Sequence, residues 1–200
     1  MSSRLRFRES MRGFYAPGAS DYGAGAAHGR ADGTRLGFAV TIRTESVPAT
    51  IADPNRRMWV EGTITAKELG PVPMPISDGT FDLFTAGHNG RFAMRYRLPF
   101  TTVDGRPMTL LGHKDVGDDR GPDMWPDTTT LFIRLIDGTV DWSDEAGPEH
   151  ARGILTLTAP MFAGQLLTFR GGPAALARFG WFFCRHLLIA YRGPYPERNR

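Results

Sequence analysis

Hydrophobic and polar residues alternate along most of the chain, which is the pattern of half-buried β-strands. The segment Arg4–Tyr15 has Leu5, Phe7 and Met11 on one face and arginines on the other. Seven further segments alternate in the same way and predict strands: Leu36–Thr44, Met58–Ala66, Thr80–Thr85, Phe92–Phe100, Pro107–Val116, Thr128–Ile136 and Arg152–Ala159.

Other segments depart from this alternation. Residues 16–33 are rich in glycine and alanine and show no periodicity, which predicts a long flexible loop that could act as a lid. The segment Val47–Arg57 contains two prolines and predicts a loop with a short helix. From Pro160 the period becomes helical, which predicts a short helix beginning there, a longer one from Pro173 to Tyr191, and a tail over residues 192–200.

The strands and their short connections predict one all-β domain over residues 1–200, with helices at its C-terminal end. Single β-barrels often reach this length. Eight strands joined by hairpin-length links favour an antiparallel eight-stranded barrel or a strongly curved sheet that encloses an apolar pocket. We expect the last helix to pack against the outer wall.

Composition and charge narrow the function classes. The chain is 41% hydrophobic and 22% charged, as is usual for globular domains. Its net charge is +3, but the basic residues are scattered along the sequence, so we expect no nucleic-acid partner. The single Cys184 cannot form an intrachain disulfide, and no signal peptide or long apolar run is evident. These features predict a cytoplasmic protein without stable membrane insertion.

Motifs for cofactors and metals are absent from the sequence. There is no GxGxxG turn, no GxxxxGK[ST] loop and no GxSxG elbow. The five histidines show neither HxH nor HExxH spacing, so we expect no metal site. If the protein is an enzyme, the prediction is catalysis without a cofactor, through shape, desolvation and a few placed polar groups.

Five segments carry a resemblance to a known family: RESMRGFY (8–15), MRYRLPF (94–100), DGRPMTLLGHKDVGDD (104–119), DMWPDTTTLFIRL (123–135) and ARGILTLTAPMFAGQLLTFR (151–170). Over about residues 6–190 they resemble a β domain attached to bacterial oxidoreductases of the cholesterol-oxidase-like (GMC) group. The flavin-binding region of those enzymes is absent here, so the resemblance does not imply oxidoreductase activity.

As a stand-alone chain, the protein is similar in size and architecture to compact β-barrel cyclases of bacterial polyketide pathways, with a lipocalin-like or allene-oxide-cyclase-like barrel. This similarity implies a cofactor-independent cyclase, of the [4+2] or [6+4] pericyclase type, acting on a polyene polyketide. The alternative is a non-catalytic lipid- or sterol-binding barrel that associates with an oxidoreductase. A third class, an assembly module, would have a barrel filled with side chains.

Three polar residues on apolar strand faces are candidate catalytic groups. Glu9 and Lys114 each lie among apolar residues, and charges that face a core need partners. They form either a structural ion pair, or charges at a strand end where both heads reach water, or a polar spot in the pocket. Such a polar spot would orient a substrate carbonyl or supply an acid–base pair. Tyr96, between Met94 and Leu98 on one face, is either a hydrogen-bond donor to that carbonyl or an ordinary core tyrosine.

Large apolar side chains are the candidate contacts of an apolar substrate, either a polyene or a lipid. In the predicted acidic loop 117–127, Trp125 could close the pocket mouth or plug the barrel end. Four aspartates of that loop, at positions 118, 119, 123 and 127, favour a solvated turn over a calcium site. The candidate substrate-binding residues are Phe38, Met58, Trp59, Phe81, Met94 and Trp125.

The last predicted helix carries a broad apolar band. Packing against the barrel or a subunit contact in a homo-oligomer accounts for such a band, and association with a membrane surface is the remaining alternative. The band consists of Phe179, Trp181, Phe182, Phe183, Leu187 and Leu188.

Overall fold

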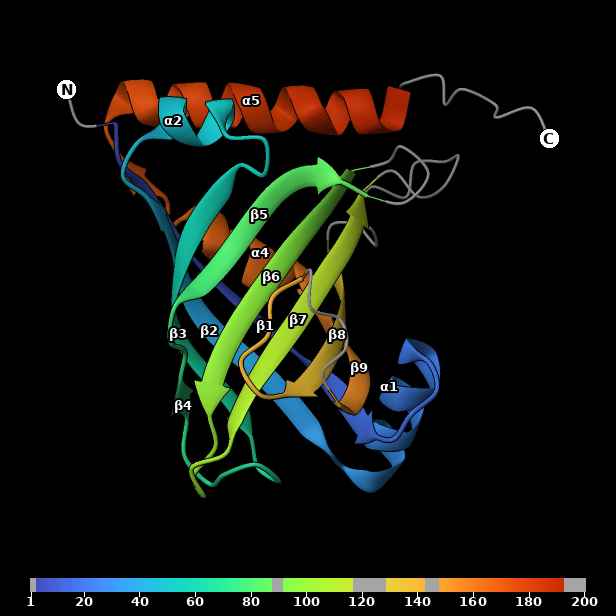
Figure 1. Ribbon diagram of the computed structural model, residues 1–200. Coiled ribbons are helices and arrows are strands. Elements are labelled where there is room, and N and C mark those ends of the chain that lie inside the picture. The colour runs from blue at the N-terminus through green and yellow to red at the C-terminus, as the bar shows by residue number, and fades with distance from the viewer. Residues whose placement is uncertain (1–2, 88–91, 117–128, 143–147, 193–200) are drawn as a thin grey trace.

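The protein folds into a closed antiparallel β-barrel of eight strands (Figure 1). The computed structural model describes residues 3–87, 92–116, 129–142 and 148–192, of which 191 and 192 are described by their backbone only. Each barrel strand pairs with the next one along the chain, and the last pairs with the first. The strands are β1 (Leu5–Pro17), β2 (Arg35–Thr44), β3 (Arg57–Ala66), β5 (Gly79–Ala86), β6 (Phe92–Thr101), β7 (Pro107–Val116), β8 (Thr130–Asp137) and β9 (Glu149–Thr156).

The predicted barrel is therefore confirmed, and the alternation of each strand accounts for it. Inward residues of β1, such as Phe7 and Met11, are buried, whereas the arginines between them are exposed. The same holds for β3, where Met58 and Val60 are buried and Trp59 is not. Residues two positions apart share a face of a strand, so each inward set contributes to one continuous core.

Strand β1 changes its partner along its length. Its C-terminal half pairs with β9, from Arg12 opposite Thr156 to Pro17 opposite Ala151. Its first residues instead pair with the short strand β10 (Arg170–Gly171). Between these two pairings, helix α4 (Ala159–Leu166) lies against β1, and the Thr168 hydroxyl accepts a hydrogen bond of 2.8 Å from the Arg8 backbone N–H. A helix thus completes this part of the wall. A second short strand, β4 (Met74–Pro75), pairs with β3.

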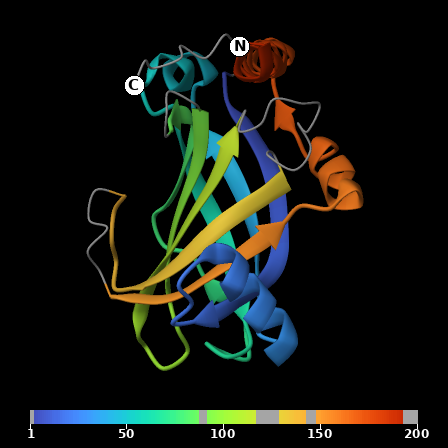
Figure 2. The same ribbon diagram turned by 90° about the vertical axis from the view of Figure 1, so that its right-hand side faces the viewer.

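Helix α5 (Pro173–Arg192) lies across one end of the barrel, beside α2 (Val47–Ala52), rather than against the outer wall as expected (Figures 1 and 2). Phe182 and Phe183 of α5 contact the ring of Phe84, at centroid distances of 6.3 and 5.3 Å. Phe84 lies within a register shift of β5, between Asp82 and Thr85, and has a φ of 50°. The outer strand faces carry arginines, so the end of the barrel is the surface that can bury these aromatic rings.

Residues 16–33 do not form the flexible loop that their composition predicted. They contain helix α1 (Tyr22–Asp32), which the Asp21 side chain caps at the start and Gly33 ends with a φ of 76°. Gly25 and Gly29 are buried because α1 touches the barrel backbone there, and a Cβ on Gly29 would lie 2.2 Å from the Tyr15 carbonyl oxygen. The glycines therefore permit close packing of a helix where a flexible loop was predicted.

Candidate active site between the barrel and its end helices

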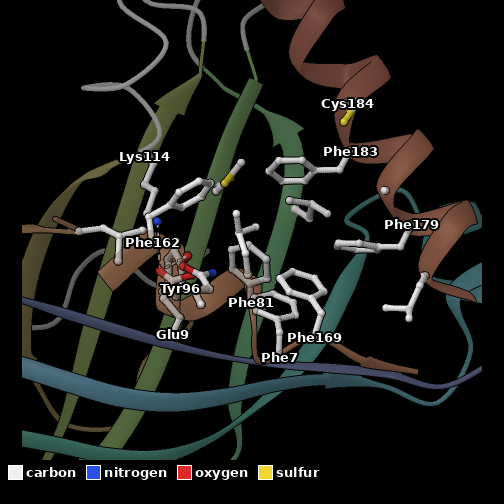
Figure 3. A pocket seen from close by; sticks show the side chains of 17 residues that line it. Phe7, Glu9, Phe81, Tyr96, Lys114, Phe162, Phe169, Phe179, Phe183 and Cys184 are labelled. Carbon is white, nitrogen blue, oxygen red and sulfur yellow. Dashed lines mark hydrogen bonds and ion pairs between the residues drawn. The ribbon is translucent and has the colours of Figure 1, made fainter. Parts of the chain in front are cut away.

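A cavity of about 380 Å³ lies between the barrel interior and helices α4 and α5 (Figure 3). This volume falls in the usual range of small-molecule sites. Its wall is mainly aromatic and aliphatic. The barrel contributes Phe7, Glu9, Phe81, Leu83, Met94, Tyr96 and Lys114, and the C-terminal segment contributes Leu157, Phe162, Gln165, Leu166, Phe169, Leu176, Phe179, Gly180, Phe183 and Cys184.

One wall of the cavity carries a buried charged cluster, which we call the Glu9 cluster: Glu9, Tyr96, Lys114 and Gln165. Glu9 Oε1 accepts hydrogen bonds from the Tyr96 hydroxyl at 3.0 Å and from Lys114 Nζ at 3.1 Å. Glu9 Oε2 accepts one from Gln165 Nε2 at 3.0 Å. Glu9, Tyr96 and Lys114 are all at most 4% exposed. An ion pair this deeply buried is rarer and more consequential than a surface pair.

The barrel topology brings these residues together from distant positions. Strands β1 and β6 lie on opposite sides of the barrel, so Glu9 meets Tyr96 across the interior. On the far wall, Tyr96 pairs with Gly112 and Met94 pairs with Lys114 in the β6–β7 register. Lys114 is therefore a diagonal neighbour of Tyr96, and its Nζ lies 5.3 Å from the centre of the tyrosine ring.

The electrostatics of the Glu9 cluster keep the Tyr96 phenol protonated. Burial raises the pKa of Tyr96 well above its ordinary value, and the negative charge and hydrogen bond of Glu9 raise it further. Lys114 has three N–H donors, and Glu9 is its one hydrogen-bond acceptor among the described residues. The Gln165 Oε1 atom is buried without a partner in the same described part of the chain. The cluster thus presents both donors and an acceptor.

The rest of the cavity is aromatic. The rings of Phe7 of β1 and Phe169 stack, with their centroids 4.5 Å apart and their planes 6° apart. The ring centroid of Phe179 lies 6.1 Å from that of Phe169. Phe179 in turn lies 6.2 Å from Phe183 on α5. Figure 3 shows the Glu9 cluster at one end of the cavity and the α5 side chains at the other. A ligand that fits this cavity is therefore mostly apolar and has a polar group at one end.

The three candidate catalytic residues, Glu9, Tyr96 and Lys114, lie together in this cluster. Of the candidate substrate contacts, Phe81 and Met94 line the cavity. Phe38 and Met58 are buried in the core but are not among the residues that line the cavity. The Phe38 ring is 5.9 Å from that of Tyr96, and Met58 belongs to the core.

The prediction for Trp59 is wrong, because its side chain is 52% exposed on the outer face of β3. It alternates with the inward residues Met58 and Val60, so the strand period itself places it outside. Trp125 and the four aspartates of the predicted acidic loop fall outside the described residues. Within the described ranges, no group of three histidine, cysteine or acidic side chains is placed to hold a metal ion.

Sequence reasoning missed the half of the cavity that the helices supply. Gln165 and Phe162 come from α4, Phe169 follows it, and Phe179 and Phe183 come from α5. For Phe179 and Phe183 the signal was present in the apolar band of the last helix. Sequence reasoning assigned that band to the outer wall, whereas part of it faces the cavity.

The fold and the cavity define a barrel with an internal, mainly apolar cavity beside a buried ion pair. Comparisons with protein-family models, with curated proteins and with solved structures found no match for this chain. The resemblance to the GMC-associated domain and to polyketide cyclases stays a prediction. The chemistry of the site must therefore be inferred from its own residues.

Proposed function

We propose that the protein is a cofactor-independent cyclase that closes a ring in a polyene polyketide, by a cycloaddition of the [4+2] or [6+4] type. The observation that carries this proposal is the buried Glu9–Lys114 pair in the wall of an otherwise apolar cavity. The substrate expected from this geometry is a flexible unsaturated chain with a conjugated carbonyl at one end.

The energetic cost of the pair supports a function beyond packing. Removing two charges from water is expensive, and apolar residues of similar volume often stabilise a protein equally well or better. A barrel that needed only a filled interior would gain nothing from Glu9 and Lys114 at 4% and 3% exposure. Strongly desolvated charges in a cavity are typical of functional sites.

The reaction requires little covalent chemistry from the protein. Two carbon–carbon σ bonds form at the expense of π bonds, no atom leaves, and no electrons are exchanged with a cofactor. Lys114 donates an N–H to the carbonyl oxygen, which withdraws electron density from the attached double bond and lowers the barrier. The aromatic wall holds the chain folded with its reacting carbons close, and such pre-orientation supplies a large part of the rate in intramolecular reactions.

Glu9 and Tyr96 act as positioning residues in this proposal. The Tyr96 proton is directed to Glu9 rather than to the cavity, and Glu9 in turn holds the Lys114 ammonium in place. The buried acceptor Gln165 Oε1 fits a substrate hydroxyl or enol beside the carbonyl. In this proposal Lys114, and not Tyr96, donates the hydrogen bond to the substrate carbonyl.

The test begins with native mass spectrometry and solvent extraction of the purified protein, to identify any small molecule that it retains. Linear polyenes with a conjugated ketone or ester are then incubated with the wild type and with Lys114→Met. Because ring closure conserves mass, the measurement is the loss of polyene ultraviolet absorption together with a new chromatographic peak. We expect this change with the wild type alone, and its absence for all polyenes that bind would contradict the proposal.

A second candidate function is a non-catalytic lipid- or sterol-binding barrel. The long aromatic wall from Phe7 to Phe183 favours it, because an aliphatic chain or ring system fits that wall without any reaction. In that case Lys114 and Gln165 would bind a lipid head group. Extracted lipids that bind stoichiometrically and are recovered unchanged, in an assay where polyenes are not converted, would favour this candidate.

A further inference from the structure

The C-terminal segment that covers the cavity carries positive charge and no negative charge. No aspartate or glutamate occurs between Glu149 and Glu197, whereas Arg170, Arg178 and Arg185 fall in this stretch. It forms α4, β10 and α5, which lie along one side and one end of the barrel (Figure 2). Every aspartate, glutamate, lysine or arginine position in this stretch is therefore an arginine.

Helix α5 has a second apolar face that the barrel does not cover. Ala175, Phe179, Phe182 and Ala190 are buried against the barrel end. Trp181 is 73% exposed, and Leu188 and Ile189 are also exposed. In a helix, residues four and seven positions apart share a face, so Trp181, Arg185 and Leu188 lie on one side together.

Helix α4 also carries exposed apolar residues. Leu166 and Leu167, at the end of α4, are 54% and 77% exposed. Leu167 also lines a groove of about 370 Å³ together with Arg6, Phe7, Arg8, Thr41, Glu61, Thr168 and Arg170. We call the exposed residues Leu166, Leu167, Arg178, Trp181, Arg185, Leu188 and Ile189 the α4–α5 face.

We propose that the α4–α5 face binds the surface of an anionic lipid bilayer. A helix with aromatic and aliphatic residues between arginines is the pattern of interfacial binding, in which apolar side chains enter the boundary of the bilayer and arginines contact lipid phosphates. The helix would lie in the plane of the surface. Among the described residues, no helix has the length and apolar character to cross a bilayer.

Charge argues against the other occupants of this face. Two copies of the chain that met through it would bring Arg178 and Arg185 of each close together, and the segment holds no carboxylate to pair with them. A nucleic acid would use the arginines and Trp181, but it would leave Leu167, Leu188 and Ile189 without apolar contacts. An anionic bilayer satisfies both the charged and the apolar residues.

The cavity reaches the surface of the same two helices. Leu166 and Cys184 line the cavity, and both are also exposed at the surface of α4 and α5. An apolar ligand would thus pass between the bilayer and the cavity without crossing water. This last step rests on the proposed function, whereas bilayer binding itself does not.

The test is co-sedimentation with large unilamellar vesicles, either of phosphatidylcholine alone or of an equal mixture of phosphatidylcholine and phosphatidylglycerol. We expect the protein to sediment with the mixed vesicles and to be released by high salt. Replacing Arg178 and Arg185 by glutamine should weaken binding about 30-fold, because each basic residue near an anionic surface contributes about 1 kcal/mol. Trp181→Ser with Leu188→Ser should weaken it about tenfold or more.

Matched control variants lie at the other end of the barrel. Val72→Ser with Val103→Ser removes two apolar side chains of similar exposure, and Arg30→Gln with Arg35→Gln removes two arginines that flank Phe14. Both pairs should bind vesicles like the wild type, and circular dichroism checks that all variants fold.

Three outcomes would overturn the proposal. The wild type could fail to sediment with anionic vesicles, the α5 variants could sediment as it does, or sedimentation velocity could show a dimer that needs Trp181. Since vesicle binding needs no turnover, failure here is distinguishable from failure of the cyclase proposal.

Discussion

Two buried carboxylates in the barrel, Asp82 and Glu9, have very different surroundings. Asp82 on β5 accepts two hydrogen bonds from Arg57 on β3, at 2.8 and 2.9 Å, and the two residues are direct neighbours in the strand register. Glu9 accepts from residues across the barrel interior and from a helix. The Arg57 side chain is 47% exposed, whereas that of Lys114 is 3% exposed.

The difference separates a structural ion pair from a candidate site. The Arg57–Asp82 pair links adjacent strands at a point where water can replace either partner, and the bidentate bond raises the pKa of Arg57 so that it stays charged. The Glu9 cluster links opposite walls of the barrel and faces a cavity. Its two charged residues are at most 4% exposed. Both pairs contain a buried carboxylate, so burial alone does not distinguish the candidate site from a structural pair. The cavity beside Glu9 makes that distinction.

The largest expected effect is that of Lys114→Met. This change leaves the Glu9 carboxylate buried beside the cavity without a cation, and breaking a buried pair in this way usually costs about 3–5 kcal/mol of folding free energy. Chemical denaturation followed by circular dichroism measures it. Polyene turnover should also be lost, because the proposed donor is gone.

A double variant makes this prediction sharper. Glu9→Gln with Lys114→Met removes both charges but leaves an amide oxygen that accepts from Tyr96 and an amide group that can pair with Gln165. We expect this variant to recover most of the lost stability and none of the turnover. Equal stability of Lys114→Met and the wild type would show instead that Lys114 is not a buried partner of Glu9.

Arg57→Met is the matched test at the structural pair. Asp82 loses two charge-assisted hydrogen bonds, but the half-exposed position lets water reach the carboxylate. The cost should therefore be smaller, about 1–2 kcal/mol. Ligand binding and turnover should equal those of the wild type. A loss of turnover that exceeds the loss of folded protein would mean that the two pairs are not functionally distinct.

These contrasts also show how far the sequence alone could predict the site. Alternation placed Glu9 among Leu5, Phe7 and Met11 and Lys114 on an inward face, because the period of a strand is a local property. An ion pair of Glu9 with Lys114 was one of the alternatives that this reasoning left open, but alternation could not decide which residues meet, because Tyr96 and Lys114 are 87 and 105 positions from Glu9. Only closure of the barrel brings them together, and closure depends on the pairing of β1 with β9.

The differences between the predicted and the observed structure at α1, α4 and α5 have local physical causes. Glycines at positions 25 and 29 suggested flexibility, but they allow α1 to touch the barrel backbone. The apolar band of α5 predicted burial without indicating which surface covers it, so the helix was assigned to the wall rather than to the end. Gln165 carries no signal of its own in the sequence, and its role depends on the gap between β9 and β1 that α4 fills.

Tyr96→Phe is expected to have a smaller effect than either charge removal. It deletes one buried hydrogen bond to Glu9, whose carboxylate still accepts from Lys114 and Gln165, so the loss should be about 1 kcal/mol. Turnover should fall by less than about tenfold, since Tyr96 positions the donor and does not contact the carbonyl. Separate kcat and KM values for the polyene measure this. A loss as complete as that of Lys114→Met would make Tyr96 the donor.

The smallest expected effect concerns acid and the helix that covers the cavity. The imidazole ring of His186 of α5 contacts two phenylalanine rings. Its centroid lies 4.0 Å from that of Phe182 and 5.4 Å from that of Phe84. Burial lowers the pKa of His186, and the charges of Arg56 and Arg185 lower it further, while the hydrogen bond with the Phe182 carbonyl opposes them. Because the folded state favours the neutral ring, its stabilisation is present above the ordinary histidine pKa of about 6.5 and is lost as the pH falls through the lower folded value.

We therefore expect backbone hydrogen exchange in α5 to become faster at pH 5 than at pH 7, after correction for the intrinsic rates. The change should correspond to less than about 1 kcal/mol, because the ring is partly exposed and solvent screens its charge. His186→Phe should abolish this pH dependence. The matched control is His150→Phe in β9, because burial also lowers the pKa of His150 but its ring lies outside α5. If His186→Phe keeps the full pH dependence, acid acts on another group, and the Glu9 cluster beneath the helix becomes the first to examine.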